Sequence, residues 1–178
     1  MIKKRGQQGR FPSGRAGPPR HPGRSTPIRV ALGADHAGFP LKDTVRRAVE
    51  ALGHTVVDRG THGTDPVDFP DITQATCAPV LDGTADRAIL VCGTGAGAIM
   101  AANKIPGIRC GLAHEPYSAH QAVEHDDANV IAMGAWLVPH ALVADIVREF
   151  LDATFDDDED TRRRVAKLNA LDLLTPGS

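Results

Sequence analysis

Apolar runs alternate with helix-patterned segments along the chain from residue 28 onward. The runs cover 28–32, 54–58, 88–92, 108–113 and 129–133, and most show no polar alternation. That pattern is typical of parallel strands buried on both faces. Between and after them, helices are predicted at 40–52, 72–81, from the third run to residue 104, at 117–124, at 141–151 and up to about residue 171. The order predicts an α/β fold: a single-domain, Rossmann-like, doubly wound sheet of five parallel strands with a C-terminal helix extension.

The strand ends indicate where a ligand would bind. In open parallel sheets, ligands bind beyond the carboxyl ends of the strands, where the strand order reverses. We therefore expect a site in the loops after the first and third strands, at 33–38 and 92–97.

Composition and charge change at residue 28. Residues 1–27 carry seven Lys/Arg and no acid, and they are rich in Gly and Pro, which predicts a disordered basic extension. We expect one domain over 28–172 and a short tail over 173–178. Residues 28–178 hold 13 basic and 22 acidic side chains, a net charge of −9, which argues against nucleic acid as the main partner. No apolar run approaches the roughly 20 residues of a membrane span, so no membrane partner is expected.

The chain has three cysteines, an odd count without CxxC spacing. This argues against a disulfide framework and a zinc–thiolate site, and it favours a reducing, cytoplasmic location with no metal. We interpret Cys77 and Cys110 as small buried hydrophobic residues, because nothing reactive flanks them.

Cys92 ends the third strand and begins a glycine-rich loop, Cys92-Gly93-Thr94-Gly95-Ala96-Gly97. The amides of such a loop can bind an anion and favour the thiolate form of a cysteine. One alternative is a dinucleotide site with Glu115 as the ribose-binding acid. The spacing is G-x-G-x-G, however, and the motif follows the third strand instead of the first. A second alternative is a tight turn with no chemical role.

Two carboxylate–histidine pairs accompany this loop. Asp35-His36 follows the first strand, and His125-Asp126 ends the helix before the fifth strand. A histidine at a helix C-terminus often serves only as a partner for the helix dipole. Together with Cys92 and the amide-lined loop, the two pairs make a candidate acid–base site.

These motifs resemble the type B ribose-5-phosphate isomerases and the related galactose-6-phosphate isomerases. The resemblance extends over about residues 28–170. The matching segments are 33–39, 41–42, 68–70, 92–97, 101–104, 106–109 and 115–119. Positions 125, 127, 129 and 130 also match.

The resemblance implies an aldose–ketose isomerisation through a cis-enediolate, without metal or organic cofactor. Cys92 matches the catalytic base, and Ala98 stands where other members carry a glutamate. Thr94 and His125 match residues that open the sugar ring. The implied substrate-binding residues are Asp35, His36, Asp68, Gly93, Gly95, Gly97, Asn103, Tyr117 and Arg164. Two residues that differ from the family pattern are further candidates: Asp126, which stands where members commonly have Asn, and Trp136, which would either stack on the sugar ring or pack in the core or against another subunit. The resemblance also implies a homodimer or homotetramer with the site at the subunit interface.

The chain departs from the family pattern where the substrate phosphate would bind. The family has Gly-x-Arg after the fifth strand, where this chain has Gly134-Ala135-Trp136. The family pattern Arg-His-x-x-Arg-Val before the last helix matches residues 160–165, so that Asp160 replaces the first arginine and Arg164 keeps the second. Losing two charge-assisted bonds, each worth roughly 1.5–3 kcal/mol, would weaken phosphate binding by roughly two to four powers of ten.

Three functions therefore stay open. The first is conversion of ribose 5-phosphate to ribulose 5-phosphate, and the second is isomerisation of an unphosphorylated or otherwise modified sugar. The third is sugar binding without turnover. The intact set of Cys92, Thr94 and His125 favours the two catalytic functions.

Overall fold

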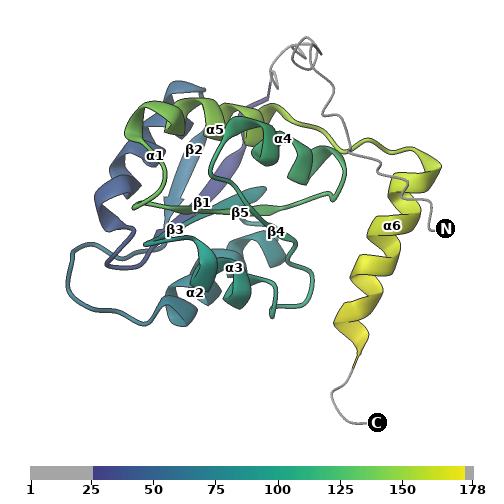
Figure 1. Cartoon of the computed structure of the whole chain (residues 1–178), viewed down its shortest axis with the longest axis horizontal. Coiled ribbons are helices and arrows are strands. Elements are labelled where there is room, and N and C mark those ends of the chain that lie inside the picture. The colour runs from purple at the N-terminus through teal and green to yellow at the C-terminus, as the bar shows by residue number, and fades with distance from the viewer. Residues whose placement is uncertain (1–25, 175–178) are drawn as a thin grey trace, which may run out of the picture.

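A parallel sheet of five strands forms the centre of the protein in the computed structural model, which describes residues 26–174 (Figure 1). The strands lie in the order β2-β1-β3-β5-β4. Their bounds are β1 (Arg29–Ala34), β2 (Thr55–Asp58), β3 (Arg87–Cys92), β4 (Cys110–Leu112) and β5 (Val130–Gly134). The predicted fold class and the parallel, five-stranded sheet are confirmed.

Helices cover both faces of the sheet. One face carries α1 (Phe39–Ala51), α4 (Pro116–Glu124) and α5 (His140–Asp152), and the other carries α2 (Phe69–Leu81) and α3 (Ala96–Ala102) (Figure 1). The C-terminal helix α6 (Glu159–Ala170) and the 3₁₀ turn η1 (Leu171–Leu173) follow. Successive strand residues point to opposite faces, so β1, β3 and β5 each contribute to two cores. Leu32, Ile89 and Met133 pack in the core that includes α1 and α5, whereas Ala31, Ala88 and Ala132 pack in the core that includes α2 and α3.

Helix α2 differs from its prediction. It begins at Phe69, three residues before the expected start, and Pro70 occupies its first turn, where a missing N–H costs nothing. Pro79 lies inside the helix without ending it. A proline there leaves the carbonyl of residue 75 without its helical donor. Arg59 Nε donates to that carbonyl of Ala75 at 3.0 Å, and this bond replaces the missing one.

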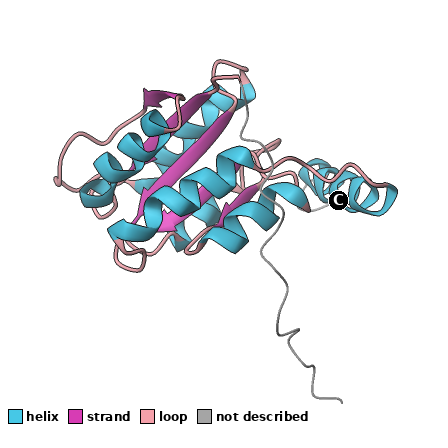
Figure 2. Cartoon of the chain, turned by 90° about the horizontal axis from the view of Figure 1, so that it is seen from above, coloured by secondary structure: helices cyan, strands magenta, loops and turns pink. Residues whose placement is uncertain are grey.

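Helix α6 stands away from the rest of the protein, beyond the end of the sheet opposite the β2–α2 connection (Figures 1 and 2). Only Thr161 and Val165 of this helix are buried. The 3₁₀ turn η1 is fastened to the segment before β4, since Gly107 N donates to Asp172 Oδ2 at 2.8 Å.

The predicted extension 1–27 lies outside the described residues apart from its last two, and most of the predicted tail 173–178 also lies outside them. Both stay predictions. Over residues 26–174, no helix has the length and apolar character needed to cross a membrane.

Arg87 joins the sheet to the end of α5. This buried guanidinium donates to the carbonyls of Phe150 and, at 2.8 Å, Ala153, and it lies over the Phe150 ring. We expect Arg87→Met to lower the free energy of unfolding by about 2–4 kcal/mol, because it leaves buried carbonyls without a donor. Urea denaturation measures the change.

The matched control is Arg148→Met, which removes an exposed arginine paired with Asp145 on α5. It should cost less than about 1 kcal/mol. Equal losses in the two variants would contradict the role given to Arg87.

Candidate active site

The carboxyl ends of β1 and β3 lie side by side and bring the two predicted loops together. Asp35 N donates to Val91 O at 3.2 Å, and Asp35 Oδ1 accepts from Gly38 N at 2.8 Å. A methyl group at Gly38 would lie 2.1 Å from Val91 O, so only glycine allows the first loop to pack against the end of β3. The expectation that these loops meet at the edge of the sheet is confirmed.

Cys92 lies at the end of β3 with its side chain turned into the glycine loop. Its residue is 6% exposed, and Sγ accepts a hydrogen bond from Gly95 N at 2.9 Å. Gly95 has a φ of +84°, a conformation that glycine adopts without strain. The turn of the glycine loop therefore directs a backbone N–H donor at the Cys92 sulfur.

Aromatic rings border the loop on both sides. A methyl group at Gly93 would meet the Trp136 ring at 2.9 Å, and one at Gly97 would meet the Phe69 ring at 3.2 Å. Trp136 N donates to Gly93 O at 3.0 Å, which fixes its backbone, yet the residue is 72% exposed. The indole is therefore an exposed apolar surface beside the loop that begins with Cys92.

His36 and Asp68 face a common cavity beside the loop, together with Asp71. Val67 N donates to His36 Nδ1 at 3.2 Å. Because Nδ1 accepts this bond, the neutral ring carries its proton on Nε2 and can donate from that atom.

Three nearby residues were missed from the sequence: Phe69 and His114, which border the loop, and Asp71, which lines the cavity with His36 and Asp68. His114 Nε2 lies 3.1 Å from Thr94 O. The available signals were weak: Phe69 follows Asp68 directly, and His114 directly follows the fourth predicted strand.

The remaining predicted residues fall into two groups. Thr94 belongs to the loop itself, and Tyr117 is exposed at the start of α4, close to the carboxyl end of β4. Asn103, His125 and Asp126 lie at the opposite edge, because they follow α3 or α4 and precede the next strand. The length of β5 separates the edges, about 13 Å at 3.3 Å per residue. One chain therefore does not bring His125 to its own Cys92.

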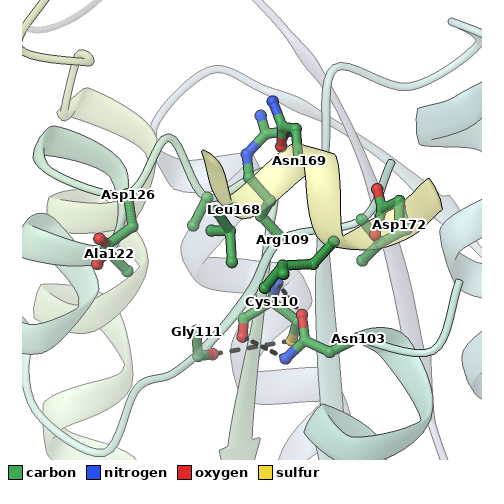
Figure 3. A pocket seen from close by; sticks show the side chains of 12 residues that line it. Asn103, Arg109, Cys110, Gly111, Ala122, Asp126, Leu168, Asn169 and Asp172 are labelled. Atoms are coloured by element: carbon green, nitrogen blue, oxygen red, sulfur yellow. Dashed lines mark hydrogen bonds between the residues drawn. The ribbon is translucent and has the colours of Figure 1, made fainter. Parts of the chain in front are cut away.

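A second cavity, of about 350 Å³, lies at the edge where the strands begin (Figure 3). Asn103 and Asp126 line it together with Leu168 and Asn169 from α6. The Asn103 side chain holds both the N–H and the carbonyl of Cys110, so it serves the start of β4.

Arg109 fixes the turn that carries His125. Its guanidinium pairs with Asp127 Oδ2 at 2.6 Å and donates to Asp127 O at 2.7 Å. Its backbone N donates to Asn129 Oδ1 at 2.9 Å. The His125 side chain itself is half exposed, 3.7 Å from Glu124. His125 is thus presented outward on a rigid turn.

Arg164 lies on α6, with its side chain 69% exposed and 3.8 Å from Asp160 Oδ2. Asp160 also pairs with Arg163 at 2.6 Å. The acid that replaces the family arginine therefore sits against the arginine that is retained.

The other cysteines and Glu115 have structural roles. Burial raises the pKa of Cys77 to about 12, and burial with the nearby Cys77 raises the pKa of Cys110 as well. Neither thiol is a candidate base. Glu115 accepts from Tyr117 N at 2.7 Å and Ser118 N at 2.6 Å, and so caps α4. This engagement argues against the ribose-binding role considered for it.

Comparison with known proteins agrees with these motifs. The family model described as Ribose/Galactose Isomerase matches residues 30–168. Ribose-5-phosphate isomerase B of Escherichia coli is 36% identical over 144 residues, 81% of this chain and 96% of that protein. D-erythrulose-4-phosphate isomerase 2 of Mycolicibacterium smegmatis is 39% identical over 132 residues, 72% of this chain and 87% of that protein.

A solved structure shares the same architecture. Ribose-5-phosphate isomerase B of Clostridium thermocellum superposes with a TM-score of 0.79 at 38% identity, covering 82% of this chain and 98% of that one.

Proposed function

Because the chain belongs to the ribose/galactose isomerase family, whose members are sugar-phosphate isomerases, we propose that it interconverts an aldose and a ketose through a cis-enediolate with Cys92 as the base. The single observation that carries the assignment of the base is the Gly95 N–H donated to Cys92 Sγ. Among the described cysteines, Cys77 and Cys110 are kept protonated by burial.

The proposed reaction moves one proton from C2 to C1 by way of Cys92 and a second proton from O2 to O1. The Cys92 thiolate removes the proton from C2 of the open-chain aldose, and the C–H electron pair forms the C1–C2 double bond of the enediolate. The carbonyl π electrons pass to O1, where loop amides at 93–97 stabilise the developing charge. The O2 hydroxyl proton then passes to the neighbouring O1. The protonated sulfur returns its proton to C1, which takes up the electron pair of the C1–C2 double bond, and an O2 electron pair forms the ketose carbonyl.

We further propose that His125, with Asp126 beside it, lies in the same active site as Cys92 of a second copy of the chain. Thr94 and His125 would open the sugar ring. Two observations support a shared site: His125 and Cys92 lie at opposite edges of one chain, and both are held in rigid turns. The proposed assembly is a homodimer or homotetramer.

Two substrates remain candidates within this reaction. Ribose 5-phosphate is the first to test, since relatives in the family are named for ribose 5-phosphate, erythrulose 4-phosphate and galactose 6-phosphate. The second is a sugar without a terminal phosphate. Two features favour it. Trp136 and Asp160 stand where the family has phosphate-binding arginines, and Asp160 lies 3.8 Å from the retained Arg164.

Cys92→Ala should abolish turnover, since no base would remain at C2. The measurement is exchange, in heavy water, of the proton on the carbon next to the carbonyl (C2 of an aldose, C1 of a ketose) over phosphorylated and free aldoses, ketoses and uronates, which reports proton removal whatever product forms. Cys77→Ala, which changes a buried cysteine on α2 outside the loop, should retain exchange. Exchange at the wild-type rate in Cys92→Ala would remove Cys92 from the mechanism.

Mixing two inactive variants tests the shared site. Cys92→Ala and His125→Ala should each be inactive alone, and unfolding and refolding them together should restore about a quarter of wild-type activity per chain. Half of randomly mixed dimers are hybrids, and each hybrid has one intact site of two. No recovery in verified hybrids would mean that Cys92 and His125 do not act across copies.

Trp136→Arg tests the second substrate. If the indole stands in place of a phosphate ligand, the variant should gain one charge-assisted bond and raise kcat/KM for ribose 5-phosphate roughly 10- to 150-fold, the equivalent of 1.5–3 kcal/mol. Trp136→Leu is the control for loss of the ring alone. A gain equal to that of Trp136→Leu would count against the assignment.

A further inference from the structure

Lys42 is a buried lysine that does not belong to the site described above. It lies on α1, its side chain is 7% exposed, and Nζ is 2.5 Å from Asp58 Oδ1. Nζ also donates to Thr61 O at 2.8 Å. Lysine is almost never fully buried unless it is paired, because its ammonium group loses hydration. A position that keeps this charge buried calls for an explanation.

The ammonium group fastens the start of the segment 59–68, which joins β2 to α2. Asp58 Oδ1 accepts from Gly60 N at 2.9 Å. Burial would raise the pKa of Asp58, but the hydrogen bonds from Lys42 and Gly60 hold it below its usual range. Asp58 is therefore ionised at neutral pH, and the pair is a salt bridge.

The backbone of the same segment is tied to β1. Arg59 N donates to Leu32 O at 2.8 Å, Ala34 N to Gly60 O at 2.7 Å, and Thr61 N to Ala34 O at 2.6 Å. Lys42 adds side-chain bonds on either side of these backbone bonds, to Asp58 and to the carbonyl of Thr61.

The far end of the segment reaches the sugar site. Val67 N donates to His36 Nδ1, and Asp68 and Phe69 follow directly. Within the described residues, the hydrogen bonds from 59–68 to other segments lie at its two ends. The backbone path of residues 62–66 therefore depends on how residues 59–61 are held.

We propose that Lys42 is a positioning residue: by clamping the start of segment 59–68 it places Val67 so that its N–H fixes the ring of His36. Lys42 then acts on the reaction without touching the sugar. The catalytic consequence rests on the proposed isomerase function, whereas the placement of His36 does not.

The alternative is a purely structural salt bridge. In that case, replacing Lys42 would lower stability and leave His36 unchanged in the folded protein. The readout must therefore report on His36 and Val67 directly, and not on activity alone.

The test uses the full chain as Lys42→Met, with nuclear magnetic resonance of the histidine rings and amide exchange. In the wild type, neutral His36 should be the Nε2–H tautomer. In the variant it should become a mixture, and exchange of the Val67 amide should speed up about tenfold or more. With a substrate in hand, kcat/KM should fall at least about tenfold. Lys167→Met, on an exposed part of α6, should change none of these.

Two further variants cover the case in which Lys42→Met does not fold. Lys42→Met with Asp58→Asn leaves no unpaired charge, and Asp58→Asn alone changes only the partner, whose side chain is 37% exposed. Both should shift the His36 and Val67 signals in the same direction. A folded variant with wild-type His36 tautomer and Val67 exchange would overturn the proposal. Lack of sugar turnover by the wild type would instead contradict the proposed function. The His36 tautomer and the exchange of the Val67 amide would then still test the positioning role of Lys42.

Discussion

The pairing of β3 with β1 on one side and β5 on the other is the constraint on which the site depends. Register sets Ala34 opposite Val91 and Gly134 opposite Cys92, so three strands end together around one sulfur. The loop after β1 then packs on the end of β3, and the residues after β5 pack on the glycine loop. A shift by one residue would move Cys92 away from both neighbours and turn it to the other face of the sheet.

Much of this arrangement could be predicted from the sequence. Apolar runs separated by helical patterns were sufficient for the sheet and its helices, because parallel strands buried on both faces leave a strong signal. The start of α2 was missed because Asp68, Phe69 and Pro70 resemble loop residues until Asp68 is recognised as the residue before the first turn. The continuation of α2 through Pro79 depends on Arg59, which lies on a distant segment and leaves no local signal.

The candidate site was predicted only in part, for a reason that is geometrical. Cys92, Asp35 and His36 follow strands, and the ends of parallel strands meet. His125 follows a helix and precedes a strand, which places it near the amino ends of the strands, opposite Cys92. The family motif alone does not show this separation, because it brings Cys92 and His125 together as residues of one site. The contact between Val67 N and His36 depends on a side-chain direction that no spacing rule gives, whereas the Asp160–Arg164 pair follows the i,i+4 spacing of a helix.

The separation of Cys92 from His125 within a chain has a genetic consequence if the sites are shared as proposed. Each chain would contribute its sulfur to one site and its histidine to another. In a mixed dimer, a chain altered at one of the two positions would disable one site and leave the other intact. A chain altered at both would disable both sites and behave as a dominant inhibitor of its normal partner.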